Sequence, residues 1–299
     1  MKLIVELNNL SMIKELKKFS LVEFVEIGIK DFSFCPALDI ELDEVSLVID
    51  NIIKNGLKVI INFQRVYTDI ELDRIKEIIL SFPLDKIAYF SYSDLGFNSL
   101  LYSLNLGDKL LFRSPTYLTN TYDIDLYGKY NKLVTVSSEI SSSELLFIAK
   151  HSKSELVVDC FGQNAIFHSR RELLKNFFLY RKLNLDCYKD NYYLIEELRE
   201  DKYPIREYHD CTVVFEPKHY FLDRELIELN ELDNVILGYI HTINLTKVDT
   251  LKIVKLINDY LCDPSVDITS TLECVKAECY KGAYDKTSYL LKKEANSNA

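Results

Sequence analysis

Residues 43–63, DEVSLVIDNIIKNGLKVIINF, contain a helix-like half followed by a strand-like half. The first half has helical spacing of apolar residues, and Gly56 stands where such a helix is expected to end. The second half, Leu57 to Phe63, is a near-continuous apolar run, which is typical of a strand buried on both faces. A helix followed by a strand of this kind predicts an α/β protein with parallel strand pairing.

The same alternation extends in both directions from this stretch. Seven strands are predicted before residue 165 and one more at Val235 to Ile240. Strands that alternate with helices pair in parallel through right-handed crossovers. This number of strands favours a TIM-like (β/α) barrel over an open sheet. The seven earlier strands are expected at residues 3–7, 22–27, 57–63, 87–90, 109–112, 133–136 and 156–160.

The alternation of strands and helices changes after Tyr180. Short aromatic and β-branched runs at residues 192–198, 203–208 and 212–215 predict a small inserted β meander at about residues 185–220. Helices are expected on either side of the last strand, at residues 222–232 and 246–261. The segment 293–299 reads as a polar tail. We therefore expect a single barrel-type domain over residues 1–292.

Composition restricts the function classes. The chain has 299 residues and a formal net charge of −10, which argues against broad, non-specific binding of nucleic acid. The longest apolar runs are too short to span a membrane, so no membrane partner is expected. The N-terminus lacks the pattern of a secretory signal, and seven scattered cysteines favour a reducing compartment. A cytoplasmic location is therefore predicted.

The stretch from Val158 to Leu174, VDCFGQNAIFHSRRELL, is the main candidate for ligand binding. A strand-like run ends at Gly162, which would allow a turn. His168, Ser169, Arg170 and Arg171 then bring one titratable group, one hydroxyl and two fixed cations together. Arginine donates hydrogen bonds in a planar fork that matches carboxylate or phosphate. The alternative is a surface loop, or a solvated helix face, whose arginines pair with acids.

Polar residues also follow most of the predicted strands, where a barrel collects its functional groups. Metal binding has little support, because there is no CxxC or HExxH motif and the five histidines are dispersed. Phosphate-loop, GxGxxG and GxSxG motifs are absent as well. The strand-end residues are Glu26, Asn62, Gln64, Arg65, Ser91, Asp94, Arg113, Thr116, Ser137, Ser138 and Glu139.

Six segments, in order, resemble the collagenase-like peptidase family of unassigned catalytic type, peptidase family U32. They are VEIGIKDFSF, DLGFNSLLYS, SSEISSSELLFIAK, FGQNAIFHSRRELLKNFF, EELREDKYPIREYHDCTVVF and YKGAYDKTSYLLKKE. The resemblance implies a barrel-type catalytic domain. It also implies either protease activity or prephenate-dependent hydroxylation of tRNA, ribosomal RNA or ubiquinone precursors.

Many members of that family carry four cysteines that hold an iron–sulfur cluster. Two of them fall in the segment that matches residues 162–174, where this chain has Ala165 and Glu172. The other pair is not apparent near Cys187 and Cys211 either. Because thiolates hold such clusters, we expect this chain to bind no cofactor. The chain thus resembles the short, cysteine-poor branch that acts in tRNA uridine hydroxylation.

The leading hypothesis is a role in tRNA wobble-uridine hydroxylation, with prephenate as co-substrate and tRNA and a paralogous family subunit as partners. The alternatives are a collagenase-like peptidase and a non-catalytic partner subunit. The catalytic residues are not predicted. The predicted ligand site has Arg170 and Arg171 on a carboxylate or an RNA phosphate, with His168 and Ser169 orienting it. Asp94, Ser138 and Glu139 complete that site.

Overall fold

The computed structural model describes residues 1–114, 116–188, 191–197, 201–208, 211–268, 272 and 279–280. The predicted polar tail and the end of the predicted domain lie outside these residues. No helix in the described part is both long enough and apolar enough to cross a membrane.

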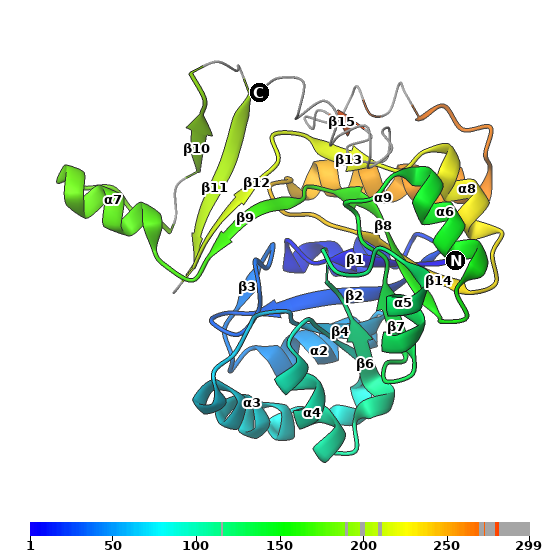
Figure 1. The fold of residues 1–299 in the computed structure, drawn as a ribbon, viewed down its shortest axis with the longest axis horizontal. Coiled ribbons are helices and arrows are strands. Elements are labelled where there is room, and N and C mark those ends of the chain that lie inside the picture. The colour runs from blue at the N-terminus through cyan, green and yellow to red at the C-terminus, as the bar shows by residue number, and fades with distance from the viewer. Residues whose placement is uncertain are drawn as a thin grey trace.

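Eight parallel strands close into a barrel, so the predicted TIM-like (β/α) barrel is confirmed (Figure 1). The strands pair in a cycle in which β8 contacts both β7 and β14, and β14 contacts β1. Parallel pairing is set by the intervening helices, which return the chain to the same end of the sheet. In chain order the strands are β1 (Lys2–Glu6), β2 (Val22–Ile29), β4 (Lys58–Phe63), β5 (Ile87–Tyr92), β6 (Leu110–Phe112), β7 (Leu133–Thr135), β8 (Leu156–Gly162) and β14 (Val235–Ile240).

Helices cover the outside of the barrel. Thr68 and Ser141 begin two of them with capping boxes, in which the hydroxyl and a glutamate three residues later satisfy free backbone amides. The helices around the barrel are α1 (Ile13–Leu16), α2 (Val45–Lys54), α3 (Asp69–Ser81), α4 (Leu95–Ser103), α5 (Thr121–Gly128), α6 (Ser142–His151), α8 (Arg224–Asn230) and α9 (Lys247–Cys262). Short 3-10 helices lie at Leu10–Met12, Leu84–Lys86 and Gly107–Lys109.

The chain also forms a second sheet, of four antiparallel strands, outside the barrel. It contains β10 (Tyr192–Ile195), β11 (Lys202–Tyr208), β12 (Cys211–Phe215) and also β9 (Ala165–Ser169), which lies ahead of the predicted meander. The helix α7 (Leu173–Arg181) follows β9 and projects away from the barrel (Figure 1). The short strands β3 (Asp39–Ile40), β13 (His219–Phe221) and β15 (Cys279–Tyr280) extend the barrel sheet at β2 and β8.

The strand register divides the barrel interior into two layers. Side chains of successive residues point to opposite faces of a strand, so each strand sends every second residue inward. The lower inward layer is apolar and forms one buried cluster. It includes Ile4, Phe24, Ile60, Leu111, Leu133, Val157 and Leu237. The residues two positions later on these strands, together with Ser91 on β5, are polar and buried. They form a second layer, here called the polar layer, nearer the carboxyl ends of the strands. Its members are Glu6, Glu26, Asn62, Ser91, Arg113, Thr135, Asp159 and Tyr239.

Candidate functional site

The polar layer lines a cavity of about 440 Å³ at the carboxyl ends of the barrel strands. Its walls also include residues of the strand-end loops and of β9, among them Phe34, Arg65, Tyr117, Phe167 and His168. A cavity of this size is within the range that binds small organic ligands. The cavity therefore is the candidate site, and its chemistry comes from the polar layer.

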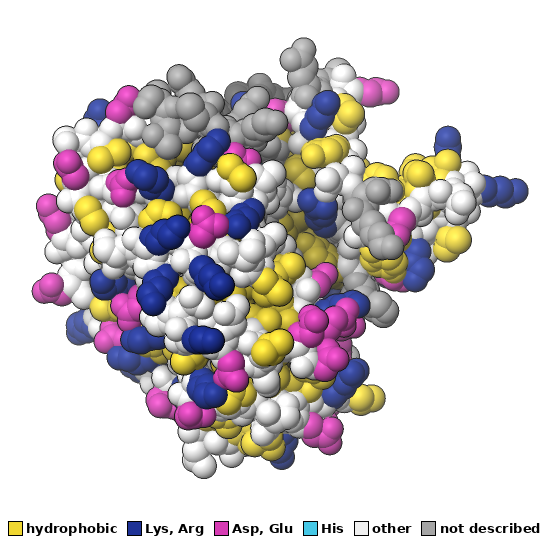
Figure 2. All heavy atoms as spheres, turned by 180° about the vertical axis from the view of Figure 1, so that it is seen from behind, with side chains coloured by type: hydrophobic (Ala, Val, Ile, Leu, Met, Phe, Trp, Pro, Cys, Tyr) yellow, Lys and Arg dark blue, Asp and Glu magenta, His cyan; other side chains and the backbone are white. Residues whose placement is uncertain are grey.

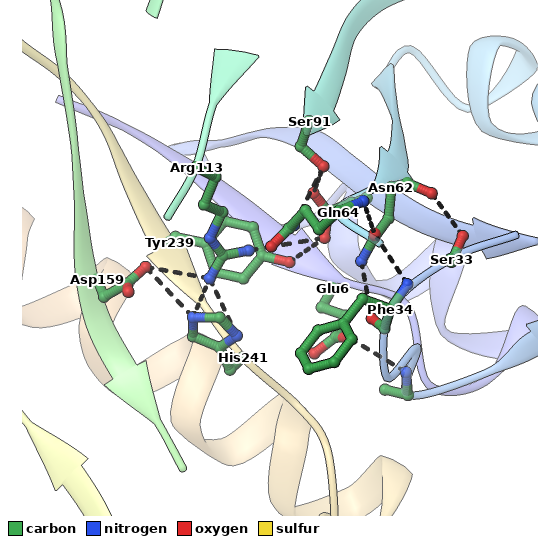
Figure 3. Close-up of polar contacts among 12 residues, drawn as sticks. Glu6, Ser33, Phe34, Asn62, Gln64, Ser91, Arg113, Asp159, Tyr239 and His241 are labelled. Atoms are coloured by element: carbon green, nitrogen blue, oxygen red, sulfur yellow. Dashed lines mark hydrogen bonds and ion pairs between the residues drawn. The ribbon is translucent and has the colours of Figure 1, made fainter. Parts of the chain in front are cut away.

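Arg113, directly after β6, lies at the centre of the polar contacts (Figure 3). Its guanidinium group lies over the ring of Tyr239, with Cζ 3.7 Å from the ring centroid. One guanidinium nitrogen is 3.3 Å from Asp159 Oδ1, and the other is 3.8 Å from Glu26 Oε2. Burial alone would lower the pKa of Arg113, but its neighbours, Asp159 first among them, raise it above the ordinary value. Arg113 therefore stays a cation in the cavity.

The two carboxylates beside Arg113 have different environments. Burial would raise the pKa of Asp159, but Arg113 and then His241 hold it below the ordinary value. Glu26 is also buried, and here burial dominates and raises the pKa, although Arg113, Ser91 and Tyr239 oppose it. Ser91 Oγ donates to Glu26 Oε1 at 2.6 Å, and the Tyr239 hydroxyl donates to Oε2. Asp159 is thus the permanent anion of the pair.

His241 completes this network from the residue after β14. Its Nε2 is 3.2 Å from Asp159 Oδ1, and its ring contacts the Arg113 guanidinium. Burial, assisted by the charge of Arg113, lowers the pKa of His241 to about 4. The imidazole is therefore neutral at pH 7, with one ring nitrogen able to donate a hydrogen bond and the other able to accept one.

Glu6 is a further titratable group in this cavity whose pKa is altered. Its oxygens accept hydrogen bonds from the backbone amides of Ala37, at 3.1 Å, and Thr242, at 2.9 Å. Burial raises its pKa to about 7, against the effect of the Thr242 amide. A carboxyl group with this pKa is suited to accept or donate a proton at neutral pH.

One hydroxyl in the polar layer has no partner. Thr135, at the end of β7, is 2% exposed and lines the cavity, and its Oγ1 makes no hydrogen bond. A buried hydroxyl without a partner costs free energy. It therefore suggests that a ligand group completes the site.

The predicted ligand residues divide into two groups. Ser138, Glu139 and His168 line the cavity, and Ser138 Oγ donates to Asn164 Oδ1 at 3.0 Å. Burial raises the pKa of Glu139, with a further contribution from Glu216.

The other four predicted residues lie outside the cavity wall. Asp94 caps the start of α4, where its side chain accepts from the Phe97 amide at 3.0 Å. Ser169 accepts from the backbone amide of Arg171 at 3.2 Å, and Arg170 lies 3.6 Å from Glu71 at the outer rim. Arg171 is exposed beyond the end of β9. The segment around residues 168–171 thus joins the cavity to the outer surface.

Gly162 has a different role from the expected turn. The strand β8 ends at Gly162 as expected, but this residue still pairs with Tyr220, and its backbone does not have positive φ. A Cβ at this position would lie 2.5 Å from His241 Cβ and 2.8 Å from Cδ2. Glycine is needed here because the His241 side chain packs directly on the backbone of β8.

Sequence reasoning missed Glu6, Asp159, Tyr239 and His241 as members of the site. Glu6, Asp159 and Tyr239 belong to the polar layer on β1, β8 and β14, and His241 directly follows β14. The signal was present in the strand period, since each of the first three lies two residues after an inward apolar residue. Reading that register, rather than the loops after the strands, would have identified these three residues, but not His241.

Cluster and metal chemistry have no assembled ligand set in the described part of the chain. No group of three His, Cys, Asp or Glu side chains there could hold a metal ion. Ala165 and Glu172 provide no thiolate, and Cys187 and Cys211 belong to separate apolar clusters. These residues do not fit an iron–sulfur cluster.

This chain is similar to several known proteins. The tRNA hydroxylation protein P2 of Bacillus subtilis (strain 168) is 26% identical over 126 residues, which are 40% of this chain and 41% of that protein. A solved U32 peptidase has 13% identity and a TM-score of 0.49, covering 81% of this chain and 92% of its own. The spore cortex-lytic enzyme SleL of Bacillus cereus has 12% identity and a TM-score of 0.40, with 86% and 74% covered. The model of peptidase family U32 matches residues 14–256, and the chain belongs to that family.

Proposed function

We propose that this protein acts in tRNA hydroxylation at a wobble uridine, and that its barrel cavity binds the small polar co-substrate. The observation that carries the proposal is the polar layer with the unpartnered Thr135 hydroxyl. The cavity can hold a molecule of the size of prephenate, and the Arg113 cation can attract one of its carboxylates. The similarity to a tRNA hydroxylation protein supports the RNA substrate.

Two groups in the cavity suit proton transfer during such a reaction. Glu6 has a pKa of about 7, and the neutral His241 lies between Asp159 and Arg113. The fixed charges of Asp159 and Arg113 hold the imidazole in one orientation, as a positioned base or acid requires. The location of the protein is then the cytoplasm, where tRNA and metabolites are both present.

Thr135→Val gives the sharpest test of the cavity. The change keeps the side-chain shape and removes a hydroxyl that has no partner, so the unfolding free energy should stay equal or rise. Mass spectrometry of tRNA nucleosides in a deletion strain should show loss of the hydroxylated uridine. Wild-type protein should restore it, Thr135→Val should restore it poorly, and the exposed-surface variant Lys150→Ala should restore it fully. Unchanged tRNA in the deletion strain would refute the proposal.

Peptidase activity is the second candidate, because the family carries that name. The described residues assemble no activated nucleophile around the cavity. The polar contacts of His241 are with Arg113 and Asp159 rather than with a serine or cysteine. Burial raises the pKa of the Cys35 thiol well above its ordinary value, which disfavours a thiolate. Cleavage of gelatin by the purified protein would favour this candidate over RNA modification.

A non-catalytic role beside a paralogous subunit is the third candidate. It predicts that a second family member co-purifies with the tagged protein and that the cavity variant Thr135→Val leaves tRNA hydroxylation unchanged. The same complementation experiment therefore separates it from the leading proposal.

A further inference from the structure

The segment 165–188, here called the arm, leaves the barrel and carries a distinct surface. It begins with β9, turns at residues 170–172 and continues into α7, which projects beyond the rest of the molecule (Figure 1). Leu174 and Phe178, four residues apart, pack on β11 and β12 with Ile205 and Val214. This contact leaves the opposite face of α7 in solvent.

The exposed face of the arm is unusually apolar and aromatic. Of 27 large apolar side chains exposed in the described chain, nine lie in the arm. On α7, Phe177 is 51% exposed and Tyr180 is 83% exposed, and Tyr188 beyond the helix is 47% exposed. Figure 2 shows apolar and basic side chains next to one another on this projection. Such a concentration marks an interaction surface.

The arm is also basic in an acidic protein. It carries five Lys and Arg residues and two acids, a net charge of +3, whereas the whole chain is −10. Arg171, Arg181 and Lys182 are exposed and form no ion pair within the described residues. The partner is therefore expected to be an anion, since a neutral apolar partner would leave these cations without compensation.

The first residues of the arm form part of the cavity wall. Ile166, Phe167 and His168 of β9 form part of the cavity wall, and Ile166 and Phe167 are about half exposed. A chain that lies along the arm would thus reach the mouth of the cavity. The exposed side chains of Tyr117 and Val66 also line the mouth of the cavity.

We propose that the arm binds single-stranded RNA and presents one nucleotide to the cavity. The inference rests on the proposed function for its RNA partner. Aromatic rings stack on unpaired bases, and neighbouring cations contact the phosphates, which is how proteins hold single strands without reading their sequence. A paired helix would hide its bases from Phe177 and Tyr180. The arm therefore selects a loop rather than a duplex.

The experiment measures binding of the full chain to a fluorescent RNA stem-loop and to a duplex with the same stem sequence. Wild-type protein should bind the stem-loop more tightly. Tyr180→Ala should weaken stem-loop binding by about tenfold or more, because one stacking partner is lost. Tyr122→Ala is the matched control, since Tyr122 is 88% exposed on α5 and lies off the arm. It should bind like wild type.

A second variant set tests the cations. Arg171→Ala/Arg181→Ala/Lys182→Ala should reduce the slope of log K against log salt by about 2, as expected for three lost contacts to a single strand. The control removes the lysines at positions 150, 252 and 255, which are exposed on α6 and α9. An equal reduction of the salt slope in both variant sets would overturn the proposal. A changed sedimentation coefficient for the Tyr180 variant with unchanged RNA binding would overturn it in favour of a protein partner.

The outcome can be separated from that of the proposed function. Full uridine hydroxylation by both arm variants in the complemented strain would overturn the arm proposal while the tRNA function stands. Unchanged tRNA in the deletion strain, together with selective loss of stem-loop binding by the arm variants, would support the arm as an RNA site while the uridine assignment fails.

Discussion

Replacement of Glu6 by glutamine should change the pH dependence of stability. Glu6 is 7% exposed and its carboxyl group has a pKa of about 7 in the folded protein, compared with an ordinary value of 4.5. Burial is the main cause, since the ionised form loses its hydration. The folded state therefore holds the Glu6 proton at pH values where the unfolded chain has released it.

The sign follows from this raised pKa. The Glu6 contribution to the unfolding free energy is fully present below pH 4.5 and is lost as the pH rises through 7. From these two pKa values, the loss between pH 5 and pH 8 is about 2.5 kcal/mol. Glutamine does not titrate, so Glu6→Gln should gain about 2.5 kcal/mol relative to wild type over that interval.

Urea unfolding followed by far-ultraviolet circular dichroism, at pH 5, 6, 7 and 8, measures this difference. Subtracting the two curves removes the contributions of titrating groups that do not interact with Glu6. Glu77→Gln, at an exposed position of α3, is the control and should run parallel to wild type. If the unfolding free energies of wild type and Glu6→Gln changed in parallel with pH, the raised pKa of the Glu6 carboxyl group would be refuted.

Three further predictions concern the cavity and its rim. Gly162→Ala should destabilise the protein by about 1–3 kcal/mol in urea unfolding, because the new methyl group overlaps His241. Tyr239→Phe should cost about 1–3 kcal/mol in the same measurement, since a buried carboxyl group loses a hydrogen-bond donor. Arg170→Ala/Arg171→Ala should abolish tRNA hydroxylation in the complemented strain with unchanged thermal unfolding; surviving modification would exclude these arginines from the site.

The barrel could be predicted because its strands are buried on both faces. Such strands read as apolar runs, and the run at Val235–Ile240 is found at the residues where the structure has β14. The helix α5 was missed because Ile124 is its one buried residue, so it has no apolar period. The strand β9 was missed because it forms by pairing with β12, more than forty residues later, and not from its own pattern.

The site could be predicted in part. Glu26, Ser91 and Arg113 were found by reading the ends of strands, and all three belong to the polar network. The network depends on distances between strands that are remote in sequence, such as the 3.3 Å between Arg113 and Asp159. No local pattern reports such a distance. The close approach of His241 to Gly162 is of the same kind, since it requires β8 and β14 to be neighbours.

The distribution of charge explains how an acidic protein could still use RNA. A net charge of −10 repels a polyanion, but this repulsion is screened beyond about 8 Å at physiological salt. The arm places its cations on a projection, so an RNA loop can contact them while the rest of the RNA stays away from the acidic barrel. RNA binding should therefore weaken with salt through the contacts of the arm.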